Sequence, residues 1–329
     1  MPHKSTLFAA FILTLVPALP GSGRAAESGQ STYIEAAMES SVLRRRIEYS
    51  VVIPKGHDAR DEPLPLLLFM HGGGGSRTYA RAGQRVLDPK WETGEVPFLV
   101  LVTPSAAPAY LDYKDGGPQW ETFLTGEFLD YIRKSYNASG DPKQTLLAGV
   151  SMGGLSSLRF AFRHPEKFGA VAASEPAIVP GLAWTDFDHR YRIFYSGPGF
   201  DRAFGNPVDE AFWIHNNPAS IAVNNARRIR ESGLEIYFEA GDLDELGLHV
   251  GAQFLHQTLW DLRIRHEFHL VRWGRHVGPG VIERGAERFE FLARVLNPPE
   301  PSAASENLMK RMHEGFGDFE VKGFWPDVD

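Results

Sequence analysis

The sequence predicts an α/β fold in which a mostly parallel central sheet is flanked by helices. Short runs such as "PLPLLLFM" and "PFLVLVTP" are almost continuously apolar, as expected for strands that are buried on both faces of a parallel sheet. Segments with a helical period separate these runs, and such alternation is typical of α/β layers. The predicted strands are Arg46–Ile53, Leu64–Met70, Phe98–Thr103, Thr145–Val150, Ala170–Ala173, Glu235–Ala240 and His266–Val271. The predicted helices are Glu121–Tyr136, Met152–Arg163, Ser220–Ser232, Val250–Asp261 and Gly285–Val295.

Two segments interrupt this alternation. Residues 181–218 combine many aromatic residues with glycine and proline, which is too apolar for a linker and too irregular for a simple crossover. We interpret them as an insertion packed over one end of the sheet, whose rings form either an apolar substrate pocket or a small core of their own. From residue 297 the chain is rich in proline and polar residues. We therefore expect residues 26–296 to form the folded domain and residues 297–329 to form a C-terminal tail.

The first 25 residues have the anatomy of a secretory signal peptide. Lys4 precedes the apolar stretch Leu7–Leu19, and small residues follow at Gly23 and Ala25. A membrane anchor is the alternative, but the stretch is shorter than the roughly 20 residues that a spanning helix needs. We therefore expect an exported protein, secreted or periplasmic, without stable membrane insertion.

Composition argues against several kinds of partner and site. The net charge of −7 and the lack of a long basic run argue against binding to nucleic acid. The chain has no cysteine, which excludes disulfides, thiolate metal sites and a cysteine nucleophile. The histidines do not follow the H-E-x-x-H spacing of a zinc site. We therefore expect neither a metal nor an organic cofactor.

The stretch "GVSMG" at residues 149–153 matches the pattern G-x-S-x-G, in which a serine projects from a sharp turn between a strand and a helix. A predicted strand leads into Ser151 and a helical pattern follows it, as the motif requires. Crowding at such a turn demands minimal side chains on both sides of the serine, which Gly149 and Gly153 supply. The helix N-terminus directs N–H groups toward the reacting centre. The pattern therefore predicts Ser151 as a nucleophile, with an incidental serine at a glycine-rich turn as the alternative.

A glycine loop, "HGGGGS" at residues 71–76, follows the predicted strand Leu64–Met70. Glycines let the backbone approach a reacting carbonyl, so that N–H groups can stabilise the oxygen that becomes negative. We predict the N–H groups of Gly73 and Met152 as this oxyanion hole. The loop lacks the pattern of a phosphate-binding loop, and we expect His71 to pack rather than to catalyse.

A nucleophilic serine needs a base to take its proton and an acid to orient that base. With this motif the partners follow along the chain in the order serine, then aspartate or glutamate, then histidine. His276 lies on the loop after the predicted strand His266–Val271, which is the position expected of the base. Asp242, Asp244 and Glu245 all follow the preceding strand. The order along the chain therefore predicts the base and leaves three candidates for the acid.

Together these pieces resemble the esterase D, feruloyl esterase and antigen 85 branch of the α/β-hydrolases. The matching stretches are "HGGGGS" at 71–76, "WETFLTGEFLDYI" at 120–132, "GVSMGGLSSL" at 149–158, "HPEKFGAVAASEP" at 164–176, "GDLD" at 241–244 and "GRHVGPG" at 274–280. The resemblance implies an α/β-hydrolase fold and a catalytic triad of Ser151, Asp244 and His276, with Asp242 as the alternative acid. The insertion at 181–218 has no pattern that matches the family, so the resemblance implies no substrate specificity.

The predicted function is that of a serine carboxylesterase, acting on a small-molecule ester or on an ester linked to a polysaccharide. Acyl transfer to a sugar or lipid alcohol would use the same residues, and the resemblance to antigen 85 allows it. A non-catalytic binding module is a third hypothesis, because a fold alone does not fix a function. Every catalytic position carries a competent residue, which favours an enzyme.

Overall fold

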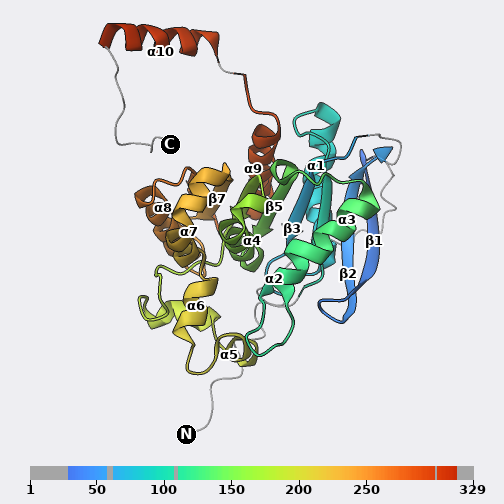
Figure 1. Cartoon of the computed structure of the whole chain (residues 1–329), viewed down its shortest axis with the longest axis vertical. Helices are drawn as coiled ribbons and strands as arrows, with labels where there is room; N and C mark the ends of the chain where they lie inside the picture. The colour runs from blue at the N-terminus through green and yellow to red at the C-terminus, as the bar shows by residue number, and fades with distance from the viewer. Residues whose placement is uncertain (1–28, 58–61, 107–109, 301, 317–329) are drawn as a thin grey trace.

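The computed structural model describes residues 29–57, 62–106, 110–300 and 302–316. The signal peptide predicted at residues 1–25 lies outside the described residues. The described residues contain one eight-stranded sheet with helices packed around it (Figure 1). No helix in this part of the chain is both long enough and apolar enough to cross a membrane.

The sheet is parallel except at one edge. Its strands lie in the order β1-β2-β4-β3-β5-β6-β7-β8. They are β1 Ser31–Ser40, β2 Arg45–Pro54, β3 Leu66–Met70, β4 Val100–Pro104, β5 Thr145–Val150, β6 Ala170–Ser174, β7 Glu235–Gly241 and β8 Glu267–Val271. Strand β2 pairs antiparallel with both β1 and β4, whereas the remaining pairs are parallel. The carboxyl ends of β3, β5, β6, β7 and β8 therefore meet at one end of the sheet, where α/β proteins place their sites.

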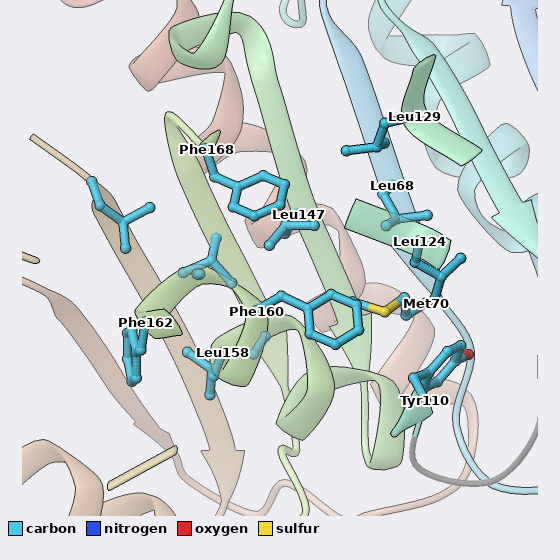
Figure 2. Close-up of a cluster of buried hydrophobic side chains, with 14 of the residues drawn as sticks. Leu68, Met70, Tyr110, Leu124, Leu129, Leu147, Leu158, Phe160, Phe162 and Phe168 are labelled. Atoms are coloured by element: carbon cyan, nitrogen blue, oxygen red, sulfur yellow. The ribbon is translucent and has the colours of Figure 1, made fainter. Parts of the chain in front are cut away.

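Helices cover both faces of the sheet, because alternate residues of a strand point to opposite sides. The α-helices of the described residues are α1 Ala80–Thr93, α2 Trp120–Phe123, α3 Leu129–Tyr136, α4 Met152–Arg163, α5 Pro198–Phe204, α6 Glu210–Asn216, α7 Pro218–Ser232, α8 Leu248–Asp261, α9 Pro279–Leu296 and α10 Ala303–Phe316. In β3, Leu66, Leu68 and Met70 join the core on the side of α3 and α4. Leu67 and Phe69 join the core on the side of α1 and α9. Figure 2 shows part of the first core, where side chains of α4 lie over those of β3 and β5.

All the predicted strands and helices are present, and their ends agree within about two residues except at α9, which begins at Pro279 and not at Gly285. The helix predicted at Glu121–Tyr136 contains a π-helical turn at Leu124–Phe128, between α2 and α3. Strand β1 and helix α1 are not anticipated by the sequence pattern. Strand β1 is an edge strand whose mixed polar and alanine-rich sequence gives little alternation. Helix α1 contains Gly83 and Pro89, both of which lower helix propensity.

Residues 181–218 form a small apolar core of their own. Phe200 stacks on Phe204 with ring centroids 4.7 Å apart, and Trp184 meets Trp213 edge-on at 4.9 Å. This packing agrees with the interpretation that the aromatic rings form a small core of the insertion, and not with the alternative that they form a substrate pocket. Beyond residue 296, where the tail is predicted to begin, the structure contains α10, which Figure 1 shows apart from the sheet and its helices.

Candidate active site

Ser151 stands at the turn between β5 and α4. Its backbone has φ 55° and ψ −118°, a conformation that non-glycine residues rarely adopt, so the turn is strained. A Cβ atom at Gly149 would lie 2.3 Å from the carbonyl oxygen of Gly153. A Cβ atom at Gly153 would lie 2.2 Å from the carbonyl oxygen of Met70. Backbone crowding therefore requires both glycines, as the motif leads us to expect.

His276 lies between this serine and an acid. Its Nε2 atom is 3.1 Å from Ser151 Oγ, and its Nδ1 atom is 3.1 Å from Asp244 Oδ2. With the proton on Nδ1, the imidazole donates to Asp244 and its Nε2 accepts from the Ser151 hydroxyl. The backbone N–H of His276 donates to Glu245 Oε2 at 3.0 Å, which fixes the loop after β8. Three side chains from three separate loops thus form one hydrogen-bonded series.

Asp244 is fixed by the turn that follows β7. Its backbone N–H donates to the carbonyl oxygen of Gly241 at 3.1 Å, and its Oδ1 accepts from the N–H of Leu246 at 2.6 Å. Burial opposes ionisation of this carboxyl. The hydrogen bond and charge of His276, together with the Leu246 N–H, nevertheless lower the pKa of Asp244 below its usual range. Asp244 is therefore an ionised hydrogen-bond acceptor at neutral pH.

Asp242, the alternative acid, has different partners. Its Oδ1 accepts from the backbone N–H of Trp273 at 2.6 Å, and its Oδ2 accepts from Arg272 Nη1 at 3.0 Å. Asp242 thus connects the loop after β7 with the loop after β8. Of these two aspartates, the structure brings Asp244 to the imidazole.

The glycine loop passes beside the serine. A Cβ atom at Gly72 would lie 3.4 Å from Ser151 Cβ, so Gly73 follows at the edge of the site, while Met152 is the first residue of α4. His71 is buried, and its Nδ1 donates to the carbonyl oxygen of Gly72 at 2.8 Å. Burial lowers the pKa of His71, so this imidazole is neutral and supports the loop.

Glu175 lies at the site but is not among the residues that the sequence motifs predict there. Glu175 directly follows β6, and its Oε2 lies 4.0 Å from His276 Nδ1. Its Oε1 accepts from Arg284 Nη1 at 2.7 Å. The available signal was an acidic residue in "AASEP", at the carboxyl end of a strand adjacent to β5.

Glu175, Asp244 and His276 offer oxygen and nitrogen atoms that lie within 4.8 Å of one another, a spacing that can hold a metal ion. These atoms already have other partners. His276 is hydrogen-bonded to Asp244, and the guanidinium of Arg284 binds Glu175. A cation beside that guanidinium would meet a like charge, so we assign no metal to the group.

Comparison with known proteins identifies the family. The sequence profile of the putative esterase family matches residues 40–269, which include Ser151 and Asp244. The chain is a member of the putative esterase family. An acetyl esterase of Caldicellulosiruptor saccharolyticus is 26% identical to this member over 151 residues, which cover 45% of this chain and 55% of that protein. The diacylglycerol acyltransferase/mycolyltransferase Ag85A of Mycobacterium leprae is 30% identical over 198 residues, which cover 56% and 55% of the two chains.

This esterase-family chain spans about half the length of the curated relatives that it matches. Solved structures show the fold. A ferulic acid esterase superposes with a TM-score of 0.65 at 24% identity, covering 81% of this chain and 99% of the other. An S-formylglutathione hydrolase from Agrobacterium tumefaciens superposes with a TM-score of 0.65 at 18% identity, covering 82% and 97%. The predicted α/β-hydrolase fold is confirmed.

Proposed function

We propose that this member of the family is a serine carboxylesterase, with Ser151 as nucleophile, His276 as general base and Asp244 as the acid that orients the base. The observation that carries the proposal is the hydrogen-bonded series from Ser151 through His276 to Asp244, with both distances at 3.1 Å. Such a series activates a serine hydroxyl that is otherwise a weak nucleophile.

In the proposed reaction, Ser151 Oγ attacks the ester carbonyl while His276 Nε2 takes the hydroxyl proton. The N–H groups of Gly73 and Met152 donate to the carbonyl oxygen as it becomes negative, and each such donor lowers a barrier by about 3 kcal/mol. His276 then gives the proton to the leaving alcohol, and an acyl-enzyme remains. Water attacks the acyl group as His276 takes its proton, and the carboxylic acid and the free serine are released. These steps need no metal and no organic cofactor.

The proposed substrates are esters of small carboxylic acids, either free or linked to a polysaccharide. The names of similar proteins support this class, because they include an acetyl esterase and a ferulic acid esterase. The rings of residues 181–218 pack largely on one another and give no separate argument for an aromatic acyl pocket. A panel of acetyl and hydroxycinnamoyl esters, assayed beside Ser151→Ala, separates short acyl groups from aromatic ones.

Acyl transfer to a sugar or lipid alcohol is the second candidate function. The similarity to the acyltransferase Ag85A favours it, because the same acyl-enzyme can react with an alcohol in place of water. The two functions differ in how the acyl group partitions when an alcohol acceptor competes with water. Exclusive formation of the free acid at high acceptor concentration would exclude transfer.

We further propose that residues 1–25 direct export and that the folded domain of residues 26–296 acts outside the cytoplasm. The charged start, the apolar stretch and the small residues near Ala25 support this proposal. Mass determination of the exported protein after expression in a bacterial host tests cleavage near Ala25.

A fluorophosphonate probe tests the catalytic serine without knowledge of the substrate. Such a probe reacts only with a serine that a base activates, so the wild-type protein should be labelled and Ser151→Ala should not. Ser232→Ala is a matched control, because this serine ends α7 and precedes the amino end of β7, whereas the site lies at the carboxyl ends of the strands. A wild-type protein that resists the probe as fully as Ser151→Ala would point to a non-catalytic binding module.

A further inference from the structure

A second carboxyl group faces the imidazole of His276. The Glu175 side chain is fully buried, and its Oε2 lies 4.0 Å from His276 Nδ1. The same nitrogen lies 3.1 Å from Asp244 Oδ2. The two carboxyl groups come from different strand ends, β6 and β7, and both lie beside one imidazole nitrogen.

The surroundings of Glu175 fix its orientation. Its Oε1 accepts from the backbone N–H of Gly241 at 2.9 Å and from Arg284 Nη1 at 2.7 Å. Its backbone N–H donates to the carbonyl oxygen of Glu239 at 2.8 Å, and its φ of 45° is rare for a non-glycine residue. Among the described residues its buried Oε2 atom has no hydrogen-bond partner. One oxygen is therefore held firmly, while the other is directed toward Asp244 and His276.

Burial and the neighbouring charges together set the protonation state of Glu175. The charged and titratable groups around it are Glu239 on β7, Asp244 after β7, His276 after β8 and Arg284 on α9. Arg284 Nη1 also binds Glu239 at 2.7 Å, so two carboxyl groups share one guanidinium nitrogen. Burial and the charge of Glu239 raise the pKa of Glu175 to about 8, although Arg284 opposes the effect. At neutral pH Glu175 therefore keeps a proton, and Oε2 is the oxygen free to carry it.

We propose that Glu175 is a positioning residue for Asp244: its protonated Oε2 donates a hydrogen bond to the Asp244 carboxylate and holds that carboxylate against His276 Nδ1. The inference rests on the proposed esterase function and deepens it. Asp244 would then accept three hydrogen bonds, from His276, from the N–H of Leu246 and from Glu175. A neutral carboxyl group is favourable at this position. An ionised Glu175 would repel the Asp244 carboxylate and would have no O–H group to donate to it.

The proposal predicts an alkaline loss of activity that depends on Glu175. When Glu175 ionises, Asp244 loses a donor and gains a negative neighbour, so kcat should fall above about pH 8. Glu175→Gln removes this fall, because an amide can donate to Asp244 through its NH₂ group and accept from Arg284 through its oxygen, yet cannot ionise. At pH 7 this variant should keep kcat within about threefold of wild type.

Glu175→Leu lacks the donor altogether. Because misplacement of a catalytic group by about 1 Å can cost about 100-fold, kcat should fall by roughly that factor at pH 7 while KM changes little. Glu166→Gln is the matched control, since Glu166 lies in an exposed ion pair with Arg228. It should leave both kcat and the pH profile unchanged.

The test measures kcat and KM between pH 6 and 10 for the wild type and these variants. The proposal is overturned if the wild type shows no alkaline fall in kcat, or if Glu175→Gln keeps the same fall. Infrared difference spectroscopy of wild type against Glu175→Gln at pH 7 gives a readout that does not depend on activity. It should show the carbonyl stretch of a protonated carboxyl group, and its absence would refute the proposal even if the protein proves not to be an esterase. Failed fluorophosphonate labelling, by contrast, counts against the proposed function alone.

Discussion

Two buried glutamates in this protein have opposite protonation states. The Glu121 side chain is 3% exposed and that of Glu175 is fully buried, so both lie out of water. Glu121 accepts from Arg159 Nε at 3.1 Å and from Arg163 Nη1 at 2.7 Å, and His164 Nε2 lies 3.2 Å away. Burial opposes ionisation of Glu121, but these three partners lower its pKa to about 2.

At Glu175 the balance of charge is reversed. There a single guanidinium, that of Arg284, binds both Glu175 and Glu239, and Asp244 lies nearby. Burial and carboxylate repulsion therefore prevail and raise the pKa to about 8. The comparison teaches that burial alone does not decide the charge of an acid. The ratio of guanidinium to carboxyl groups decides it, giving a structural ion at Glu121 and a neutral hydrogen-bond donor beside the site at Glu175.

The largest expected effect concerns Asp244, the carboxylate beside Glu175, and distinguishes it from Asp242 by activity. Asp244→Asn should lower kcat by about 10⁴-fold, because the amide favours the wrong imidazole tautomer. Asp242→Asn should lower kcat by about tenfold or less, since Asp242 supports the loop through Trp273 without touching His276. Steady-state kinetics of both variants at pH 7 decide the matter. Equal losses, or the larger loss in Asp242→Asn, would contradict the assignment of the acid.

The next effect is on stability. Glu121→Gln should lower the free energy of unfolding by about 3–5 kcal/mol at pH 7, because the buried guanidinium of Arg159 loses the carboxylate that faces it. Urea unfolding measures the loss. Glu166→Gln, which removes an exposed ion pair with Arg228, should cost no more than about 1 kcal/mol. A loss below 1 kcal/mol in Glu121→Gln would show that the cluster does not depend on this ion.

A third effect is a loss of stability at low pH. Because the folded-state pKa of Glu121 lies below its ordinary value of 4.5, its contribution is present above about pH 4.5 and is lost as the pH falls toward 2. The interval between these pKa values corresponds to about 3 kcal/mol. Urea unfolding at a series of pH values should show this loss in the wild type and not in Glu121→Gln. Parallel curves for the two proteins would contradict the lowered pKa.

A last effect on stability should have the opposite sign. Between about pH 4.5 and 8 the folded protein holds a proton on Glu175 that the unfolded chain releases, so this group lowers stability as the pH rises. Glu175→Gln should match the wild type within about 1 kcal/mol near pH 5. It should become the more stable protein as the pH approaches 8. Urea unfolding at both pH values tests this, and a variant that weakens relative to wild type at alkaline pH would contradict a neutral Glu175.

The position of the proposed nucleophile is predictable from the sequence because the motif around it is contiguous. Gly149 and Gly153 lie within two residues of Ser151. The crowding at Gly149 comes from the backbone of the turn between β5 and α4, whereas the crowding at Gly153 comes from the end of β3. The apolar runs of the parallel strands are equally local signals. Strand β1 is not predicted because its side chains are only partly buried and because the strand depends on pairing with β2. Helix α1 is not predicted because tertiary packing against the sheet, and not intrinsic helix propensity, stabilises a segment that contains Pro89.

The sequence by itself determined the α/β class, the serine elbow, the glycine loop and the histidine that follows the last strand, because each of these features depends on a short pattern of residues that are adjacent in the chain. Only the tertiary structure shows that Asp244, and not Asp242, lies at the imidazole of His276, because the two residues lie two positions apart in one turn and have different partners. Only the tertiary structure could reveal Glu175, because its protonation depends on Glu239, Asp244 and Arg284. Those groups come from distant parts of the chain, and the electrostatic energy between them depends on distances that no local pattern encodes.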